Sequence, residues 1–143
     1  MNNDVHIGRL ISIFYKRIHR KIGQEVRQYG LTSIQGRILG FVYNESPIRD
    51  IFQKDIEEEF DIRRSSVTSV LQLMEKKGYI KRISVSEDAR LKKIILTEHG
   101  IEIQNKIYSS ILQVEKSLDE ELNNEEKELL VRLINRLSDK IAD

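Results

Sequence analysis

The sequence is most informative between residues 60 and 100, which read FDIRRSSVTSVLQLMEKKGYIKRISVSEDARLKKIILTEHG. Over residues 63–77 apolar side chains recur at steps of three and four, so the spacing predicts an amphipathic helix. Its expected buried side chains are Val67, Val70, Leu71 and Met74. Gly78 is the expected end of this helix, because glycine readily adopts the left-handed conformation that closes helices.

The hydrophobic period changes after this helix. Ile83 and Val85 alternate with polar residues, and so do Ile94 and Leu96 beyond a charged segment. Alternation is typical of half-buried strands, so we predict a two-stranded hairpin with a charged tip. Because two strands alone are only marginally stable, the hairpin is expected to pack against helices.

A long helix with two contrasting faces is predicted over residues 5–29, and Gly30 is expected to end it. The apolar face carries Ile7, Ile11, Phe14, Ile18, Ile22 and Val26. The opposite face is basic and carries Arg9, Lys16, Arg17, Arg20, Lys21 and Arg27.

Two shorter helices are predicted before residue 60. Thr32 and Gln35 have the spacing of a capping box, which opens a helix that runs to about Val42. Residues 44–47 are expected to form a loop, since they include the only proline. A third helix is predicted over residues 52–60.

Two further helices with strong apolar stripes are predicted after the hairpin. Thr97 restarts a helix, and Asn123 with Glu126 caps a second one. The two stripes are Ile103, Ile107, Ile111, Val114, Leu118 and Leu122, and then Leu129, Leu130, Leu133, Ile134, Leu137 and Ile141. Together with the first helix, these stripes exceed what a compact core can cover, which favours dimerisation through the termini. The alternative is an intramolecular three-helix cluster that hides all three stripes.

The expected fold class is mainly α with a small β-hairpin wing, in one domain of residues 1–143. A winged helix-turn-helix core is placed at residues 31–97, and dimerisation helices at residues 1–30 and 98–143. The N-terminus lacks a secretory pattern, and no uninterrupted apolar run approaches the ~20 residues of a membrane span. A cytoplasmic location without membrane association is therefore expected.

Charge is unevenly distributed, although the formal net charge is only +1. Residues 62–97 contain nine basic and three acidic residues, whereas residues 98–143 contain six basic and eleven acidic residues. A local basic segment on a nearly neutral protein indicates a surface for phosphate groups. A solvated charged face is the alternative interpretation.

The predicted helix at 63–77 and the hairpin after it have the order of a winged DNA-binding motif. Opposite the apolar stripe, the helix should present Arg64, Ser65, Thr68, Ser69 and Gln72. Short hydroxyl side chains allow close approach to DNA, while glutamine and arginine can pair with base edges. Arg63 adds positive charge at the helix N-terminus, which attracts phosphate. The hairpin tip adds Arg90, Lys92 and Lys93, which are long enough to reach a minor groove or the backbone.

The same residues resemble the recognition helix and wing of MarR-family transcription regulators. The most specific part is Asp88-Ala89-Arg90, followed by Leu96-Thr97-x-x-Gly100. The order of the helices along the whole chain is similar as well. The resemblance implies a homodimeric repressor on double-stranded DNA, whose two recognition helices enter successive major grooves of a palindromic operator while each wing lies on the flanking minor groove.

The resemblance also implies roles for individual residues. It places Ser65, Ser66, Thr68, Ser69 and Gln72 on the recognition helix, and Arg90 on the wing tip. Arg63, Arg64 and Lys92 are predicted as further DNA contacts from their charge and position. It makes Asp88 the carboxylate that orients the wing arginine. In the family a Ser or Thr cap is frequent at the position of Arg63, and a base-reading arginine is common at the position of Ser69. A winged-helix module that binds protein, without specific DNA readout, is the alternative function.

Catalysis is not expected. His6, His19 and His99 lie in three different predicted helices without ligand-like spacing, and no nucleophile elbow or phosphate loop is present. No cofactor or metal is predicted, although His99 near Glu98 and Glu102 is a local cluster of residue types that can bind metal. Because the chain has no cysteine, sensing through a thiol is excluded.

Control by a small-molecule effector is a further implication of the resemblance. The effector is expected between the dimerisation helices and the winged core. Side chains that fit the lining of such a cleft are Phe14, Tyr15, Arg17, Phe41 and Tyr43. The alternative is that these aromatic residues belong to the ordinary core.

Overall fold

The computed structural model describes residues 5–143, and within this range it contains six helices and two strands. In chain order they are α1 (Ile7–Arg27), α2 (Ser33–Glu45), α3 (Gln53–Phe60), α4 (Arg64–Lys76), β1 (Ile80–Ser84), β2 (Lys92–Leu96), α5 (Glu98–Glu121) and α6 (Asn124–Lys140). The two strands pair antiparallel. The predicted fold class, mainly α with a small hairpin wing, is confirmed. The first four residues of the expected segment 1–30 lie outside the described range.

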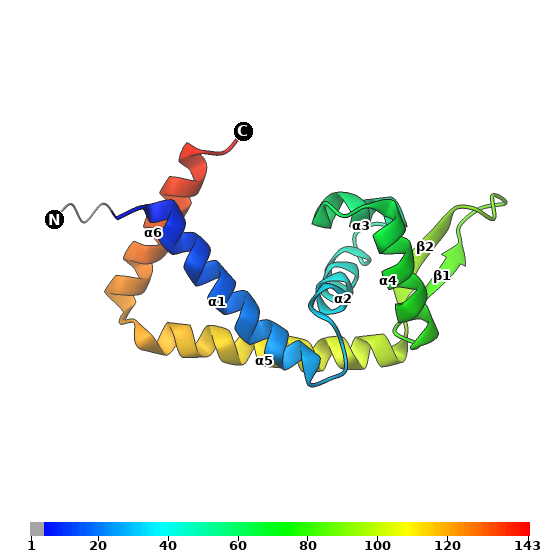
Figure 1. Cartoon of the computed structure of the whole chain (residues 1–143), viewed down its shortest axis with the longest axis horizontal. Helices are drawn as coiled ribbons and strands as arrows, with labels where there is room; N and C mark the ends of the chain where they lie inside the picture. The colour runs from blue at the N-terminus through cyan, green and yellow to red at the C-terminus, as the bar shows by residue number, and fades with distance from the viewer. Residues whose placement is uncertain (1–4) are drawn as a thin grey trace.

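Helix α5 connects two parts of the molecule (Figure 1). At one end it meets the winged unit, which we define as α2, α3, α4, β1 and β2. Toward the other end it is crossed by α1 and followed by α6, and we call α1, α5 and α6 the terminal helices. Among the described residues, no helix combines the length and apolarity that a bilayer crossing needs.

The hydrophobic core lies mainly in the winged unit. Ten apolar side chains there are less than 2% exposed. They are Ile38, Leu39, Val42, Ile51, Ile56, Val67, Leu71, Met74, Ile80 and Ile94. Three of the four side chains predicted for the α4 stripe are among them, and Val70 is half-buried. Each fully buried aliphatic side chain contributes about 1.5–3 kcal/mol, so burial in this unit is a large part of the folding free energy.

The predicted capping residues begin and end the helices. The Gln35 N–H donates to Thr32 Oγ1 (3.3 Å) and the Thr32 N–H donates to Gln35 Oε1 (3.0 Å), which is a complete capping box. Thr97 and Asn123 cap α5 and α6 through their side-chain oxygens. Gly78, just after α4, has a φ of 82°, the left-handed conformation that glycine adopts without strain.

The loop predicted at residues 44–47 begins later than expected. Helix α2 continues through Glu45, so Asn44 is helical. Ser46 keeps helical backbone angles (φ −62°, ψ −27°), and the helix stops there because Pro47 has no N–H to continue the helical hydrogen bonds.

The wing begins earlier than predicted and presents a different side to the core. Strand β1 starts at Ile80, and its register places Arg82 opposite Ile94. Because side chains alternate along a strand, Ile83 lies on the other side of β1 and is 40% exposed. Val85 lies beyond the end of β1. The prediction that Ile83 and Val85 mark the buried side of the first strand is therefore wrong.

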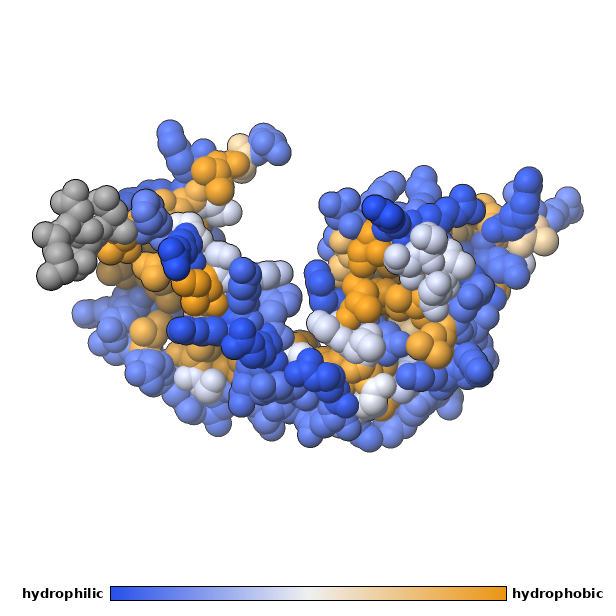
Figure 2. Space-filling model, in the orientation of Figure 1, coloured by the Kyte–Doolittle hydropathy of each residue, from blue (hydrophilic) through white to orange (hydrophobic). Residues whose placement is uncertain are grey.

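The terminal helices leave much of their apolar surface open to solvent. Helix α6 has no buried residue. The exposed apolar side chains of these helices include Ile7, Leu10, Ile11, Phe14, Leu112, Leu129, Leu130, Val131, Ile134 and Leu137. Figure 2 shows hydrophobic side chains at the surface over α1 and α6. The alternative of an intramolecular cluster that hides all three stripes is therefore wrong.

An apolar groove runs between the terminal helices. It has a volume of about 710 Å³. Its apolar lining consists of Phe14, Leu112, Leu118, Leu122, Leu130 and Val131. Contiguous apolar surface rimmed by polar residues often marks a site of protein–protein interaction.

Candidate nucleic-acid interface

A tight turn joins α3 to α4. Asp61 has a φ of 50° and is the one non-glycine residue with positive φ in the described chain. Aspartate tolerates this conformation better than most residues, because its short polar side chain can bond locally. The Ile62 N–H donates to the Glu57 carbonyl oxygen (3.1 Å), and the Ile62 side chain packs against the core. The turn thereby fixes the orientation of α4 relative to α3, as a helix-turn-helix requires.

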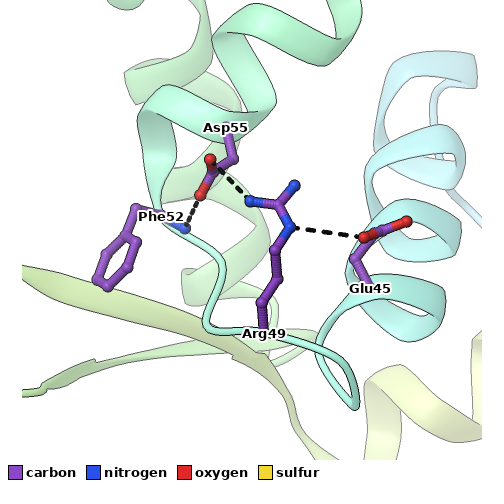
Figure 3. Close-up of polar contacts among 4 residues, drawn as sticks. All are labelled: Glu45, Arg49, Phe52 and Asp55. Carbon is purple, nitrogen blue, oxygen red and sulfur yellow. Dashed lines mark hydrogen bonds and ion pairs between the residues drawn. The ribbon is translucent and has the colours of Figure 1, made fainter.

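A charged cluster holds the start of α3 (Figure 3). The Asp55 carboxylate accepts hydrogen bonds from the Phe52 N–H (2.8 Å) and from Arg49 Nη1 (3.0 Å). Arg49 Nε also lies 3.5 Å from a carboxylate oxygen of Glu45, at the end of α2. The hydrogen bond to Asp55 is the main cause that raises the pKa of Arg49 above its usual value. The cluster ties α2, the loop and α3 together.

Gln53 connects α3 to α4. Its Nε2 donates to Thr68 Oγ1 (2.8 Å) and to the Arg64 carbonyl oxygen (3.3 Å). The Thr68 hydroxyl donates to the same carbonyl oxygen (2.9 Å) and the side chain is half-buried. Thr68 is therefore less available to a ligand than the other polar residues predicted for this helix. Sequence reasoning missed Gln53, because a contact between two helices leaves no periodic signal.

The outer side of α4 is polar and accessible. Arg64, Ser65, Ser66, Ser69 and Gln72 are all exposed. The Ser69 hydroxyl donates to the Ser65 carbonyl oxygen (3.1 Å), so its lone pairs remain open to a donor.

The N-terminus of α4 is open to an external anion. Arg63 precedes the helix in an extended conformation, and its side chain makes no capping hydrogen bond. The N–H groups of the first turn therefore have no side-chain acceptor from the cap position. Such groups suit a phosphate oxygen, with Arg63 and Arg64 beside them.

Asp88 and Arg90 interact at the tip of the wing. Asp88 Oδ1 accepts from the Arg90 backbone N–H (3.0 Å) and from Arg90 Nε (3.2 Å). The Arg90 side chain nevertheless remains 93% exposed. The carboxylate thus orients the guanidinium group without covering it.

A basic concavity lies between α3, α4 and the wing, with a volume of about 380 Å³. Its basic side chains are Lys54, Arg64, Arg82, Arg90 and Lys92, and Glu57 is its one acidic side chain. Three of the predicted residues, Arg64, Arg90 and Lys92, are thus brought together from a helix and a hairpin. Lys54 was not among the predicted residues, because it comes from an acidic helix. Positive charge gathered in a concave surface attracts a phosphate backbone strongly.

An ion pair fixes the wing to α4. Arg82 Nε donates to Glu75 Oε2 (3.2 Å), and Arg82 Nη2 approaches Oε1 (3.5 Å). These bonds lower the pKa of Glu75 below its usual range. Arg82 lies on the core side of β1 and its side chain is 26% exposed, so the pair links the first strand of the wing to α4.

A backbone clasp joins the winged unit to α5. The Thr97 N–H donates to the Tyr79 carbonyl oxygen (3.1 Å), and the Thr97 hydroxyl donates to the Gly78 carbonyl oxygen. A Cβ atom at Gly100 would overlap the Tyr79 carbonyl oxygen. The His99 ring stacks on the Tyr79 ring at a centroid distance of 5.1 Å. The Thr97-x-x-Gly100 motif therefore has a structural role at this joint.

The residues expected at an effector cleft lie in different surroundings. Phe14 lines the apolar groove between the terminal helices. Phe41 packs edge-on against Phe60 in the winged unit, with ring centroids 5.8 Å apart. Tyr15, Arg17 and Tyr43 are exposed. Phe14 and Phe41 thus belong to two separate apolar surfaces of the chain.

The helix-turn-helix, the wing and the basic concavity define a winged-helix protein built to contact nucleic acid. Comparison with known proteins supports this class. The sequence model of the MarR family matches residues 29–91. The HTH-type transcriptional regulator SarZ of Staphylococcus haemolyticus is 27% identical over 128 residues, which cover 90% of this chain and 84% of SarZ.

Solved structures of Staphylococcus aureus MepR, a transcription regulator of the multidrug efflux pump MepA, share the fold. One has a TM-score of 0.83 at 24% identity and covers 96% of this chain and 100% of MepR. MepR in complex with DNA has a TM-score of 0.77 at 24% identity over 99% of this chain and 100% of MepR. MepR bound to ethidium bromide has a TM-score of 0.66 at 25% identity over 99% of this chain and 100% of MepR.

The chain belongs to the MarR family. It is a DNA-binding transcription regulator and not an enzyme.

Proposed function

We propose that the chain acts as a homodimer that represses transcription from a palindromic operator. The open apolar groove between α1, α5 and α6 supports this assembly, since a second copy offers a complementary apolar surface. A two-fold dimer presents two copies of α4, which match two half-sites about 34–36 Å apart along the duplex.

In the proposed complex, α4 enters the major groove and the wing lies on the flanking minor groove. Ser65, Ser69 and Gln72 face base edges, while Arg63 and Arg64 contact phosphate beside the helix N-terminus. Arg90, held by Asp88, extends into or along the minor groove, and Lys92 contacts the backbone. The single observation that carries this arrangement is the basic concavity, because it gathers cations from α3, α4 and the wing.

Binding to a labelled duplex over a range of salt concentrations tests the arrangement. A dimer that neutralises roughly 6–10 phosphates loses about a thousandfold or more in affinity between about 50 and 200 mM salt. Arg64→Ala and Arg90→Ala should each weaken binding by about 1–3 kcal/mol, that is, roughly 5- to 150-fold. Lys106→Ala, on α5 and outside the lining of the concavity, is the matched control and should change affinity by less than about twofold. A flat salt response would contradict DNA as the partner and favour a protein-binding module.

Asp88 can be tested separately as a positioning residue. Asp88→Asn keeps the size of the side chain but removes the charge that orients Arg90. We expect weaker binding in the wild-type background and no additional loss when Arg90 is already alanine. Additive losses in the double variant would contradict a role through Arg90.

We also propose that a small aromatic or anionic effector releases the operator. The complex of MepR with ethidium bromide supports an aromatic ligand. The proposed location is between the terminal helices and the winged unit, near Tyr15, Arg17, Phe41 and Tyr43, whereas Phe14 is assigned to the groove that a second copy covers. Effector candidates should lower affinity for the operator without dissociating the dimer. As a regulator of transcription, the protein is proposed to act in the cytoplasm, where the DNA is.

A further inference from the structure

Four basic side chains form a row along α1. They are Arg9, Lys16, Arg20 and Arg27, which we call the α1 row. Their spacings of seven, four and seven residues return to nearly the same side of an α-helix, and at 1.5 Å per residue the row spans about 27 Å. All four side chains are exposed. Arg17 and Lys21 flank the row.

The charge of α1 is not balanced within the chain. Helix α1 contains six basic residues and one acidic residue, whereas α5 contains two basic and six acidic residues. Both basic residues of α5, Lys106 and Lys116, form ion pairs. By contrast, none of the six basic residues of α1 forms an ion pair with any residue in the range 5–143.

This arrangement costs the helix stability. Lys16 and Arg20 are like charges four residues apart, and so are Arg17 and Lys21, which destabilises a helix by about 0.2–0.5 kcal/mol per pair. Arg9 lies in the first turn, where the helix dipole favours acidic residues, and α1 has none there. An anion outside the chain would remove both penalties.

The α1 row is placed where it remains free in the proposed dimer. It lies on the opposite side of the helix from Ile7, Ile11 and Phe14, whose apolar surface a second copy would cover. In Figure 1 α1 crosses in front of α5, and Figure 2 shows strongly hydrophilic side chains along α1 on the same face of the molecule that presents α4. Helix α1 lines the apolar groove through Phe14 and also contacts α2 of the winged unit, so its basic side is outside the groove that we assign to the second copy.

We propose that the α1 row is a second phosphate-contact surface for the duplex that α4 and the wing bind. This inference rests on the proposed function. A duplex carries one negative charge per about 1.7 Å of its axis, so a row about 27 Å long meets many phosphates without needing a fixed register. The row adds affinity that does not depend on base sequence and increases the salt dependence of binding.

The variant Arg9→Gln/Lys16→Gln/Arg20→Gln/Arg27→Gln tests this inference, with binding to a labelled random-sequence duplex measured between about 50 and 200 mM salt. The slope of log affinity against log salt should become shallower by about 0.9 for each lost phosphate contact, and we expect at least one contact per protomer. The variant Arg9→Lys/Arg20→Lys/Arg27→Lys retains the charge and should keep the wild-type slope. The control Lys106→Gln/Lys116→Gln, on α5, should keep it too. Circular dichroism and sedimentation establish that each variant is folded and assembled as the wild type is.

Two outcomes would overturn the inference in distinguishable ways. If the wild type binds DNA and the neutralised variant binds with the same affinity and slope, the α1 row does not contact the duplex, and it serves an acidic protein or no partner. If the wild type itself binds no DNA at any salt concentration, the proposed function fails and the inference fails with it.

Discussion

Leucine side chains of the helical apolar stripes are buried in the winged unit but half-buried or exposed on the terminal helices. Leu71 in α4 is 0% exposed and closes the core of the winged unit, whereas Leu130 in α6 is 43% exposed. Both residues belong to apolar stripes with helical spacing. The comparison teaches that spacing identifies the apolar side of a helix but not what covers it. In the winged unit the chain covers its own stripes, and in the terminal helices we propose that a second copy does.

The largest effect is expected where the terminal helices are prevented from associating. Leu130→Glu places a charge in the apolar groove, where an unpaired buried charge is strongly unfavourable. The protein should become monomeric at micromolar concentration, and its affinity for a palindromic site should fall by about 100-fold or more, because two linked half-site contacts become independent. Sedimentation and DNA titration measure the two effects.

The control for this variant is Asn135→Glu, on α6 but outside the lining of the groove. It adds the same charge outside the groove and should leave assembly and DNA affinity unchanged. A Leu130→Glu variant that remains dimeric would show that the groove is not the interface.

Shortening a leucine side chain to alanine should have a different effect in each of the two regions. Leu71→Ala removes buried methyl groups from a closed core and should lower the free energy of unfolding by about 2–5 kcal/mol. Leu130→Ala should instead weaken assembly, so its effect on thermal unfolding should depend on protein concentration. Calorimetry at two protein concentrations distinguishes the variants. If the unfolding temperatures of both depended equally on protein concentration, the distinction between a self-contained core and an intermolecular interface would be contradicted.

The joint between the two regions is sensitive to a single methyl group. Gly100→Ala would force a Cβ into the Tyr79 carbonyl group, and we expect a loss of about 1–3 kcal/mol in the free energy of unfolding. Gly8→Ala is the matched control on α1, because a Cβ there meets no atom within 4 Å. Alanine at that exposed helical position should stabilise by less than about 1 kcal/mol. Chemical denaturation measures the free energy of unfolding of both variants. If Gly100→Ala were no more destabilising than Gly8→Ala, the role of Gly100 in the contact between the winged unit and α5 would be contradicted.

The smallest effect is expected at the ion pair between the wing and α4. The pKa of Glu75 is lowered in the folded protein, so its contribution to stability is complete above the unfolded pKa of about 4.5 and is lost as the pH falls through the folded pKa. Because the Glu75 side chain is 41% exposed, that contribution should be below about 0.5 kcal/mol. Glu75→Gln should remove this part of the acid-induced loss of stability. Urea unfolding near pH 6 and near pH 3 measures how much stability each protein loses on acidification. Equal losses in the wild type and in Glu75→Gln would contradict a stabilising ion pair at Glu75.

Much of the fold could be predicted because its helix ends depend on local chemistry. Thr32 with Gln35, and Asn123 with Glu126, form the capping boxes that their spacing indicates. The start of β1 could not be predicted by alternation. Arg82 occupies an inward position of the strand, where its guanidinium reaches Glu75, so a charged residue interrupts the apolar pattern at that point.

The candidate site was predictable where its residues are close in sequence. Asp88 and Arg90, two positions apart, form the contact that the motif implies. Gln53 and Lys54 were not predictable, since they reach the site only through the packing of α3 against α4. Nor could the sequence separate Phe14 from Phe41, because tertiary structure alone decides which apolar surface each joins.

Selection of bound genomic fragments at near-physiological salt, followed by footprinting, tests most directly whether the chain is a dimeric, sequence-specific DNA-binding protein. The account predicts a short palindrome protected as two half-sites with centres about one helical turn apart. Enrichment of no sequence over random DNA, by a protein that is dimeric and free of effector, would contradict it.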